Sequence, residues 1–138
     1  MIRYEPMGFD LGAGATAADL ARLEMTYHPD SGAKELSAYF SVSGQDKHLR
    51  VFFSHVDMFR VIDEMHRPLE EQGMEIVGHL SNHFAYKVEG SSFWAAQREV
   101  FEVLLPEATH YLFVTGGDCV DVITREEPRF CLVNSNTE

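Results

Sequence analysis

A strict alternation of apolar and polar residues in the second quarter of the chain constrains the fold more than any other feature. Between residues 36 and 43 every second position is apolar, and three of the positions between them are serines. Successive side chains of a β-strand point to opposite faces, so this pattern predicts a strand with one buried face. A register slip of one residue would bury the serines, so the register should be firmly set. The predicted core face is Leu36, Ala38, Phe40 and Val42.

The alternation continues on both sides of this strand. Residues 22–28 alternate before a turn at residues 29–32, and residues 49–53 alternate after a second turn at residues 44–46. Both turns contain glycine and aspartate, which favour tight reversals of the chain. We therefore predict a three-stranded antiparallel meander over residues 22–53.

After Ser54 the apolar residues follow a helical spacing. Ser54 and Asp57 are placed as a capping pair at the start of a helix. Pro68 is expected to kink or restart this helix, and Gly73 is expected to end it. The apolar face of the predicted helix consists of Met58, Ile62, Met65 and Leu69.

A second helix is predicted to begin at Ser91 or Ser92 and to end before Pro106. Residues 81–82 are expected to form a hairpin turn between two strands, and the last strand is expected to lie at a sheet edge. The remaining predicted strands cover residues 74–80, 84–88, 111–114, 119–124 and 130–133.

These elements predict an α+β fold with a mostly antiparallel sheet and two main helices packed on one face. The length of 138 residues fits a single domain over residues 1–138. Residues 1–19 are expected to form an irregular lead-in rich in glycine and alanine, and residues 134–138 a frayed tail.

The charge of the chain is strongly acidic and unevenly distributed. It contains 11 basic and 22 acidic residues, a formal net charge of -11. Residues 1–69 contribute -3 and residues 70–138 contribute -8. Direct binding to nucleic-acid phosphates requires clustered lysine and arginine, so we expect no direct nucleic-acid partner. The asymmetry favours a cationic partner that meets the second half of the chain, although the charge also serves solubility.

The sequence also indicates the cellular compartment. No basic segment followed by an apolar stretch begins the chain, and no run of 18 apolar residues is present. Cys119 and Cys131 lie close in sequence, where a bridge is feasible but not implied. We expect a cytoplasmic protein with two reduced thiols and no membrane partner.

No catalytic motif is complete in the sequence. Cys119 follows Asp118, and neighbouring acids disfavour a reactive thiolate. The segment Gly12-Ala13-Gly14 lacks the residues that complete a phosphate-binding loop. His79 and His83 suggest a metal pair, but their intervening residues predict a turn and no third ligand has a fixed spacing. We therefore expect no catalysis, no metal and no cofactor.

Acidic and aromatic residues are the remaining candidates for function. Exposed aromatic residues, and tryptophan in particular, are enriched at the energetically important positions of protein interfaces. Clustered acids complement lysine and arginine on a partner. The candidate partner-binding residues are Glu70, Glu71, Glu75, Trp94, Asp118, Asp121, Glu126 and Glu127.

The chain resembles the immunity proteins of bacterial polymorphic toxin systems, including those of contact-dependent growth inhibition. The resemblance is carried by residues 4–12, 117–123 and 127–130 within a small acidic α+β chain. It implies that the protein binds a cognate toxin domain, typically a basic nuclease, and blocks its active site or substrate surface.

Two other readings stay open from the residues alone. One is a small enzyme or ligand-binding domain that uses His79, His83 and the turn from Asp118 to Asp121, with or without a divalent metal. The other is an acidic regulator that mimics nucleic acid, which shares the electrostatics of an immunity protein but has a different target.

Overall fold

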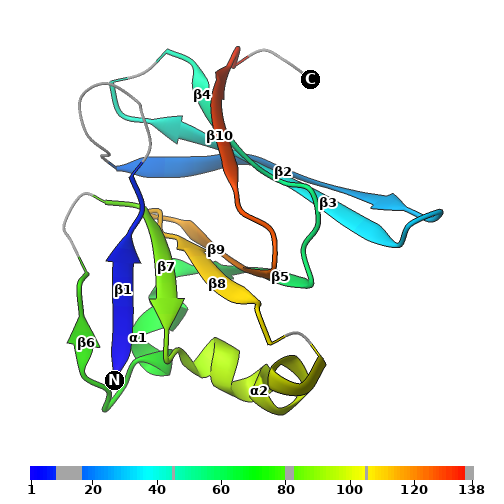
Figure 1. Ribbon diagram of the computed structural model, residues 1–138. Helices are drawn as coiled ribbons and strands as arrows, with labels where there is room; N and C mark the ends of the chain where they lie inside the picture. The colour runs from blue at the N-terminus through cyan, green and yellow to red at the C-terminus, as the bar shows by residue number, and fades with distance from the viewer. Residues whose placement is uncertain (9–16, 45, 80–82, 105, 136–138) are drawn as a thin grey trace.

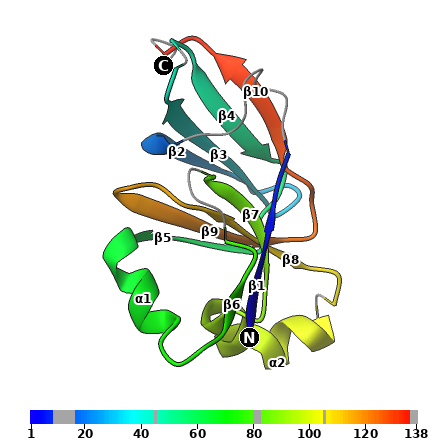
Figure 2. The same ribbon diagram turned by 90° about the vertical axis from the view of Figure 1, so that its left-hand side faces the viewer.

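A computed structural model of the chain describes residues 1–8, 17–44, 46–79, 83–104 and 106–135 (Figure 1). Two β-sheets are stacked on each other, and the helices lie on the far side of the larger sheet (Figure 2). Within the described ranges, no helix has the length and apolar character needed to cross a membrane.

The smaller sheet contains the predicted meander. Its strand order is β10-β4-β3-β2, with antiparallel pairing throughout, and β10 lies at an edge as predicted. The four residues of the predicted core face of β3 are at most 4% exposed, which confirms the register. The strands are β2 (Ala18–His28), β3 (Ala33–Val42), β4 (His48–Phe53) and β10 (Arg129–Val133).

The larger sheet has six strands in the order β5-β9-β8-β7-β1-β6. Every neighbouring pair is antiparallel except β1 and β6, which run parallel. Its strands are β1 (Ile2–Pro6), β5 (Met58–Asp63), β6 (Ile76–Val77), β7 (Ala85–Glu89), β8 (Thr109–Phe113) and β9 (Asp118–Thr124).

Aromatic side chains from both sheets fill the space between them. The ring of Phe40 from the smaller sheet lies 5.2 Å from that of Phe84 and 5.6 Å from that of Phe113, measured between centroids. Phe53 lies 5.6 Å from Tyr111. One hydrophobic cluster therefore includes residues of both sheets.

The helices cover the outer face of the larger sheet. Residues Glu64–His66 form the short 3-10 helix η1, which leads into α1 (Arg67–Glu70), and α2 spans Ser92–Leu104. The extent of α2 matches the prediction. The α+β class and the mostly antiparallel pairing are confirmed, and both helices lie on one face. However, the strands form two sheets where one was predicted, and α1 has only four residues.

The long first helix predicted from Ser54 to Gly73 is wrong. Its first part forms β5, and only four residues of it form α1. Met58 and Ile62 satisfy a helical spacing, but they also share one face of a strand with Arg60 between them. Because Arg60 is charged, the apolar alternation is interrupted at its centre, and the strand pattern is hidden.

The hairpin predicted between residues 74–80 and 84–88 is also wrong. Strand β1 lies between β6 and β7, and β6 is only two residues long. The predicted turn at residues 81–82 lies outside the described residues. The lead-in predicted for residues 1–19 is not irregular throughout, because it contains β1 and the first residues of β2.

Gly78 ends β6 where the chain passes close to β1. Its φ is +88°, and a Cβ at this position would collide with the carbonyl oxygen of Tyr4. Only glycine combines this backbone conformation with so close an approach. The sequence places Gly78 in an alternating pattern, whereas its actual role is to let β6 lie against β1.

We predict that Gly78→Ala lowers the free energy of unfolding by at least about 2 kcal/mol, because backbone strain and a steric collision add together. Gly32→Ala is the matched control, since Gly32 has a φ of +76° but no atom within 4 Å of an added Cβ. Gly32→Ala should lower the free energy of unfolding only by the backbone strain, about 1 kcal/mol. Urea denaturation of both variants measures the difference, and equal losses would contradict the packing argument.

Candidate functional site

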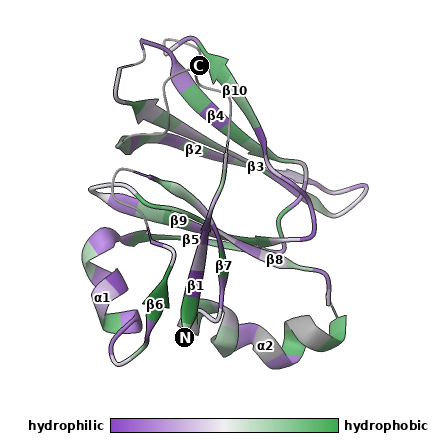
Figure 3. Cartoon of the chain, turned by 60° about the vertical axis from the view of Figure 1, so that its left-hand side comes forward, coloured by the Kyte–Doolittle hydropathy of each residue, from purple (hydrophilic) through white to green (hydrophobic). Residues whose placement is uncertain are grey.

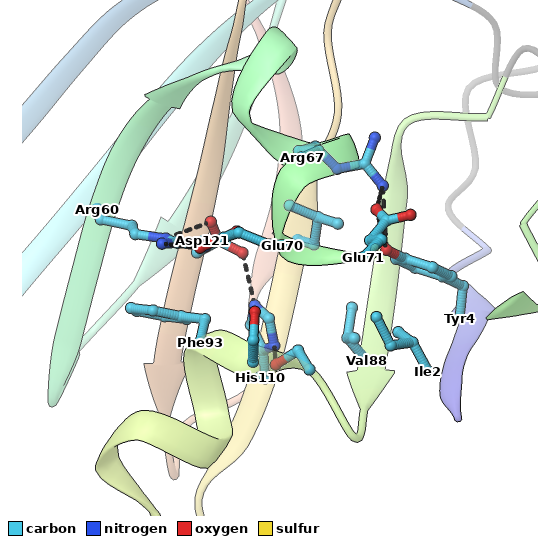
Figure 4. Close-up of a pocket in the computed structure, with 13 residues that line it drawn as sticks. Ile2, Tyr4, Arg60, Arg67, Glu70, Glu71, Val88, Phe93, His110 and Asp121 are labelled. Carbon is cyan, nitrogen blue, oxygen red and sulfur yellow. Dashed lines mark hydrogen bonds and ion pairs between the residues drawn. The ribbon is translucent and has the colours of Figure 1, made fainter. Parts of the chain in front are cut away.

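A network of charged and polar side chains lies between the larger sheet and the helices (Figure 4). Its centre is the outer face of the sheet, where most other side chains are apolar. Strands β5, β8 and β9 contribute one polar residue each to it, and the remaining members come from α1 and the start of α2. They are Arg60, His110, Asp121, Glu70 and Ser91.

Arg60 joins two carboxylates. Its Nε donates to Oδ2 of Asp121 at 2.9 Å, and its two terminal nitrogens donate to the carboxylate of Glu70 at 2.8 and 2.6 Å. The guanidinium also lies 4.1 Å from the centre of the Phe93 ring. Burial acts to lower the pKa of Arg60, but the two carboxylates outweigh it and raise that pKa.

His110 extends the network from Asp121 to the start of α2. Its Nε2 lies 2.6 Å from Oδ1 of Asp121, and its Nδ1 lies 2.8 Å from Oγ of Ser91. A carboxylate only accepts hydrogen bonds, so Nε2 carries the proton toward Asp121. In the neutral ring the Ser91 hydroxyl donates to Nδ1, while its oxygen accepts the backbone N–H of Trp94 at 3.1 Å.

Ser91, His110 and Asp121 are hydrogen-bonded in the same succession as a hydrolase triad, but the imidazole is reversed, with Nδ1 toward the serine and Nε2 toward the aspartate. The three residues are 8%, 4% and 3% exposed. The cavity beside them has a volume of about 30 Å³, which is enough for about one water. The hydrogen bonds of this arrangement join β8 and β9 to the start of α2.

A second polar cluster ties the segment after β5 to the first strand. The Tyr4 hydroxyl donates to Oε1 of Glu71 at 2.7 Å, and Arg67 donates to both the Tyr4 oxygen and that same carboxylate oxygen, at 3.1 and 3.0 Å. Burial and the hydrogen bond to Glu71 raise the pKa of Tyr4 strongly. The ring of His79 packs edge-on against Tyr4, and burial together with Arg67 lowers the pKa of His79.

The eight predicted partner-binding residues fall into three groups. Glu70 and Glu71 are half-buried in the internal ion pairs, and Trp94 is half-buried against the small cluster of Phe93 and Ile123. Asp121 is 3% exposed, so its assignment to a binding surface is wrong. The exposed residues are Glu75, Asp118, Glu126 and Glu127.

These four exposed acids do not form one patch. Asp118 begins β9, whereas Glu126 and Glu127 follow its other end. Asp118 is instead the register partner of Asp63 on β5, and the backbone N–H of the next residue, Glu64, bonds to Gly117. Asp63 and Glu64 were not among the predicted site residues, because a helix was predicted there and a helix gives no reason to place them beside Asp118.

In the alternative site, the structure places both histidines against one tyrosine ring and directs the two aspartates to different faces of a strand. Both rings pack against Tyr86, at 5.5 and 5.2 Å between centroids. Asp118 and Asp121 are three residues apart on one strand, so they point to opposite faces. Across the described part of the chain, no three histidine, cysteine, aspartate or glutamate side chains converge as metal ligands.

The two cysteines are free and belong to different sheets. Cys119 is fully buried on β9, and burial raises the pKa of its thiol. A thiol with a raised pKa is a poor nucleophile at neutral pH. Cys131 is exposed on β10.

Comparisons of the chain with protein-family models, with curated proteins and with solved structures returned no match.

We predict that Arg60→Leu lowers the free energy of unfolding by about 3 kcal/mol, because it leaves the Asp121 carboxylate buried without its cation. The double variant Arg60→Leu/Asp121→Leu removes both charges and should regain at least half of that loss. Denaturant titrations of the wild type and both variants test this. A double variant less stable than Arg60→Leu would show that apolar residues cannot replace the pair.

We also predict a specific loss of stability at alkaline pH. The folded protein holds the Tyr4 proton to a higher pH than the unfolded chain, in which tyrosine titrates near 10. The contribution of Tyr4 is therefore complete below about pH 10 and is lost as the pH rises further. Tyr4→Phe should flatten this decline in thermal-melting profiles, while Tyr27→Phe, an exposed control on β2, should leave it unchanged. Identical slopes for Tyr4→Phe and wild type would contradict the prediction.

Proposed function

We propose that this protein binds a cationic protein partner and neutralises it, as the immunity proteins that it resembles do. The partner would be a basic toxin domain of the nuclease type, met in the cytoplasm. The observation that carries the proposal is the uneven use of charge. Arg60 of the larger sheet and Arg67 of α1 are paired inside the molecule, while Asp118 and Glu75 face outward and form no ion pair among the described residues.

The internal pairing of arginines supports this reading. Arg60 bonds to Glu70 and Asp121, and Arg67 bonds to Glu71 and Tyr4. These two guanidinium groups engage three carboxylates, so the internal network has no excess cation to offer the exposed acids. Among the described residues, Asp118 and Glu75 are exposed and take part in no ion pair.

The pairing of like charges across two strands further supports the proposed binding of a cationic partner. Asp63 and Asp118 are directly opposed on β5 and β9, and Glu64 follows immediately. We call these three residues the acidic end. Like charges directly opposite each other destabilise a sheet, whereas a cation placed between them would remove the repulsion. The Asp63 carboxylate also accepts the backbone N–H of Met65 at the start of η1, so Asp118 and Glu64 are the acids of this end that remain for a cation.

An acidic surface would neutralise a basic nuclease by electrostatics and occlusion. A negative field raises the rate at which a cationic protein arrives, and complementary charges fix its orientation. Carboxylates can then occupy the positions on the toxin that otherwise receive phosphates. This mechanism requires neither catalysis nor a cofactor from the chain described here.

The proposal is tested by isolating the partner and measuring association. The protein is immobilised, the captured protein is identified and purified, and its toxic activity is assayed with and without an excess of this chain. The expected partner is basic, and its activity is abolished by stoichiometric binding. A partner with an acidic surface, or one that keeps full activity when bound, would overturn the proposal.

We predict that Glu64→Lys/Asp118→Lys slows association with that partner about tenfold at low salt, because acids near the contact steer the encounter. The matched control is Glu126→Lys/Glu127→Lys, which makes the same charge change beyond the other end of β9. Asp30→Lys in the β2–β3 turn is a second control. Stopped-flow association at several salt concentrations gives the rates, and equal slowing by both double variants would count against the acidic end as the contact.

A further inference from the structure

We infer that the free edge of β6 and the groove beside it bind an extended basic segment of the partner, which adds to the larger sheet as a further strand. The inference rests on the proposed function for the cationic character of the partner. It adds the place and the mode of binding, which the charge distribution alone does not give.

Strand β6 has an unpaired edge. It is the last strand in the order β5-β9-β8-β7-β1-β6, and no strand of the described residues pairs with its other side. Exposed strand edges carry unpaired backbone groups that can bind another extended chain. Most proteins protect such edges with charged side chains or cover them with a helix or loop. Here the edge residues Ile76 and Val77 are apolar, and they are 42% and 37% exposed.

The backbone of Ile76 is directed toward this edge. The N–H of Ile2 on β1 donates to the carbonyl of Glu75 at 2.7 Å, so the peptide groups of Glu75 face β1. Successive residues of a strand direct these groups to alternate sides. The N–H and carbonyl of Ile76 therefore face away from β1, where an added strand would bond.

A groove of about 440 Å³ lies beside this edge, between β6 and the segment of η1 and α1. Figure 3 shows the largely hydrophilic α1 across from the hydrophobic β6. Nearby on the same segment, Met65 and Leu69 are 78% and 69% exposed. The groove is lined by Glu64, Arg67, Pro68, Glu71, Ile76 and His79.

The charges of the groove favour a basic occupant. Arg67 is held by Glu71 and Tyr4, so it is already compensated, and Glu64 adds a carboxylate that has no ion-pair partner among the described residues. Ile76 is the register partner of Ile2, whose side chain is on the helix-covered face of the sheet. Every second side chain of an added strand would point to that same face, toward these carboxylates.

A second copy of this chain is a poorer occupant. It would bring the same acids of the groove and of the acidic end into contact with each other, and such like-charge contacts disfavour association. A helix is also disfavoured, because it would satisfy its own backbone groups and leave those of Ile76 unused. An extended segment with lysine or arginine at alternate positions would form hydrogen bonds with the backbone of the edge and ion pairs with the carboxylates.

The experiment uses a blocked seven-residue peptide of alternating lysine and valine as the probe, with a glutamate–valine peptide of equal length as its counterpart. Binding to the full chain is measured by fluorescence anisotropy, and amide hydrogen exchange is followed by NMR. We expect the lysine peptide to bind at least tenfold more tightly than the glutamate peptide. We expect it to slow exchange of the Ile76 amide at least tenfold.

Four variants separate the contribution of the backbone hydrogen bonds from that of the charges. Ile76→Pro removes the edge N–H and should weaken lysine-peptide binding at least tenfold, since proline cannot donate to a ladder. Ile76→Ala keeps that N–H and should retain most of the binding. Glu64→Gln should weaken binding about threefold, while Glu126→Gln, remote from the groove, should not.

The outcomes separate this inference from the function on which it rests. Absence of lysine-peptide binding, or binding that leaves Ile76 exchange unchanged in the wild-type chain, overturns the added-strand mode even if the captured partner is basic and inhibited. Binding with Ile76 protection supports the edge site even if the captured partner is not a toxin. If Ile76→Pro does not fold, the exchange measurement on the wild type decides alone.

Discussion

The ion pair between Arg60 and Asp121 is the interaction on which the helix-covered side of the molecule depends. The two residues are register partners near the centres of β5 and β9, in a layer that is otherwise mostly apolar. A lone charge there would be costly, but each compensates the other. From this pair, Glu70 reaches α1 and His110 reaches Ser91 at the start of α2. The helices are thus oriented by hydrogen bonds with fixed geometry, which apolar contacts alone would not impose.

That internal pairing also shapes the surface. By holding α1 against the sheet, the pair of Arg60 and Glu70 keeps the segment after β5 facing β6 across a groove. By engaging arginines internally, it leaves outward-facing acids such as Asp118 with little local compensation. The negative field outside the network comes from the acidic excess of the composition, and the proposed binding of a basic partner uses the acids that face outward.

The sequence predicted those parts of the fold in which local pattern and burial agree. The meander of β2, β3 and β4 alternates cleanly because one face lies on the core between the sheets, and α2 has a serine cap before it and a proline after it. The prediction failed at β5, where Arg60 interrupts the alternation, and at β6, where a two-residue strand carries too little pattern. Of the candidate site residues, Asp118 and Glu75 are exposed as expected, whereas Asp121 is buried because its partner Arg60 is 61 positions away.

The sequence by itself determined the α+β class, the register of the central strand and the acidic excess, since these follow from side-chain periodicity and composition. Only the tertiary structure decided which charges are neutralised and which face outward. Asp63 meets Asp118, and β1 enters between β6 and β7, through pairings between distant segments. Hydrogen bonds between strands are made by backbone groups that every residue shares, so the local sequence does not specify which strand becomes the neighbour. The neighbouring strands are selected instead by the burial of apolar side chains on both faces of the larger sheet.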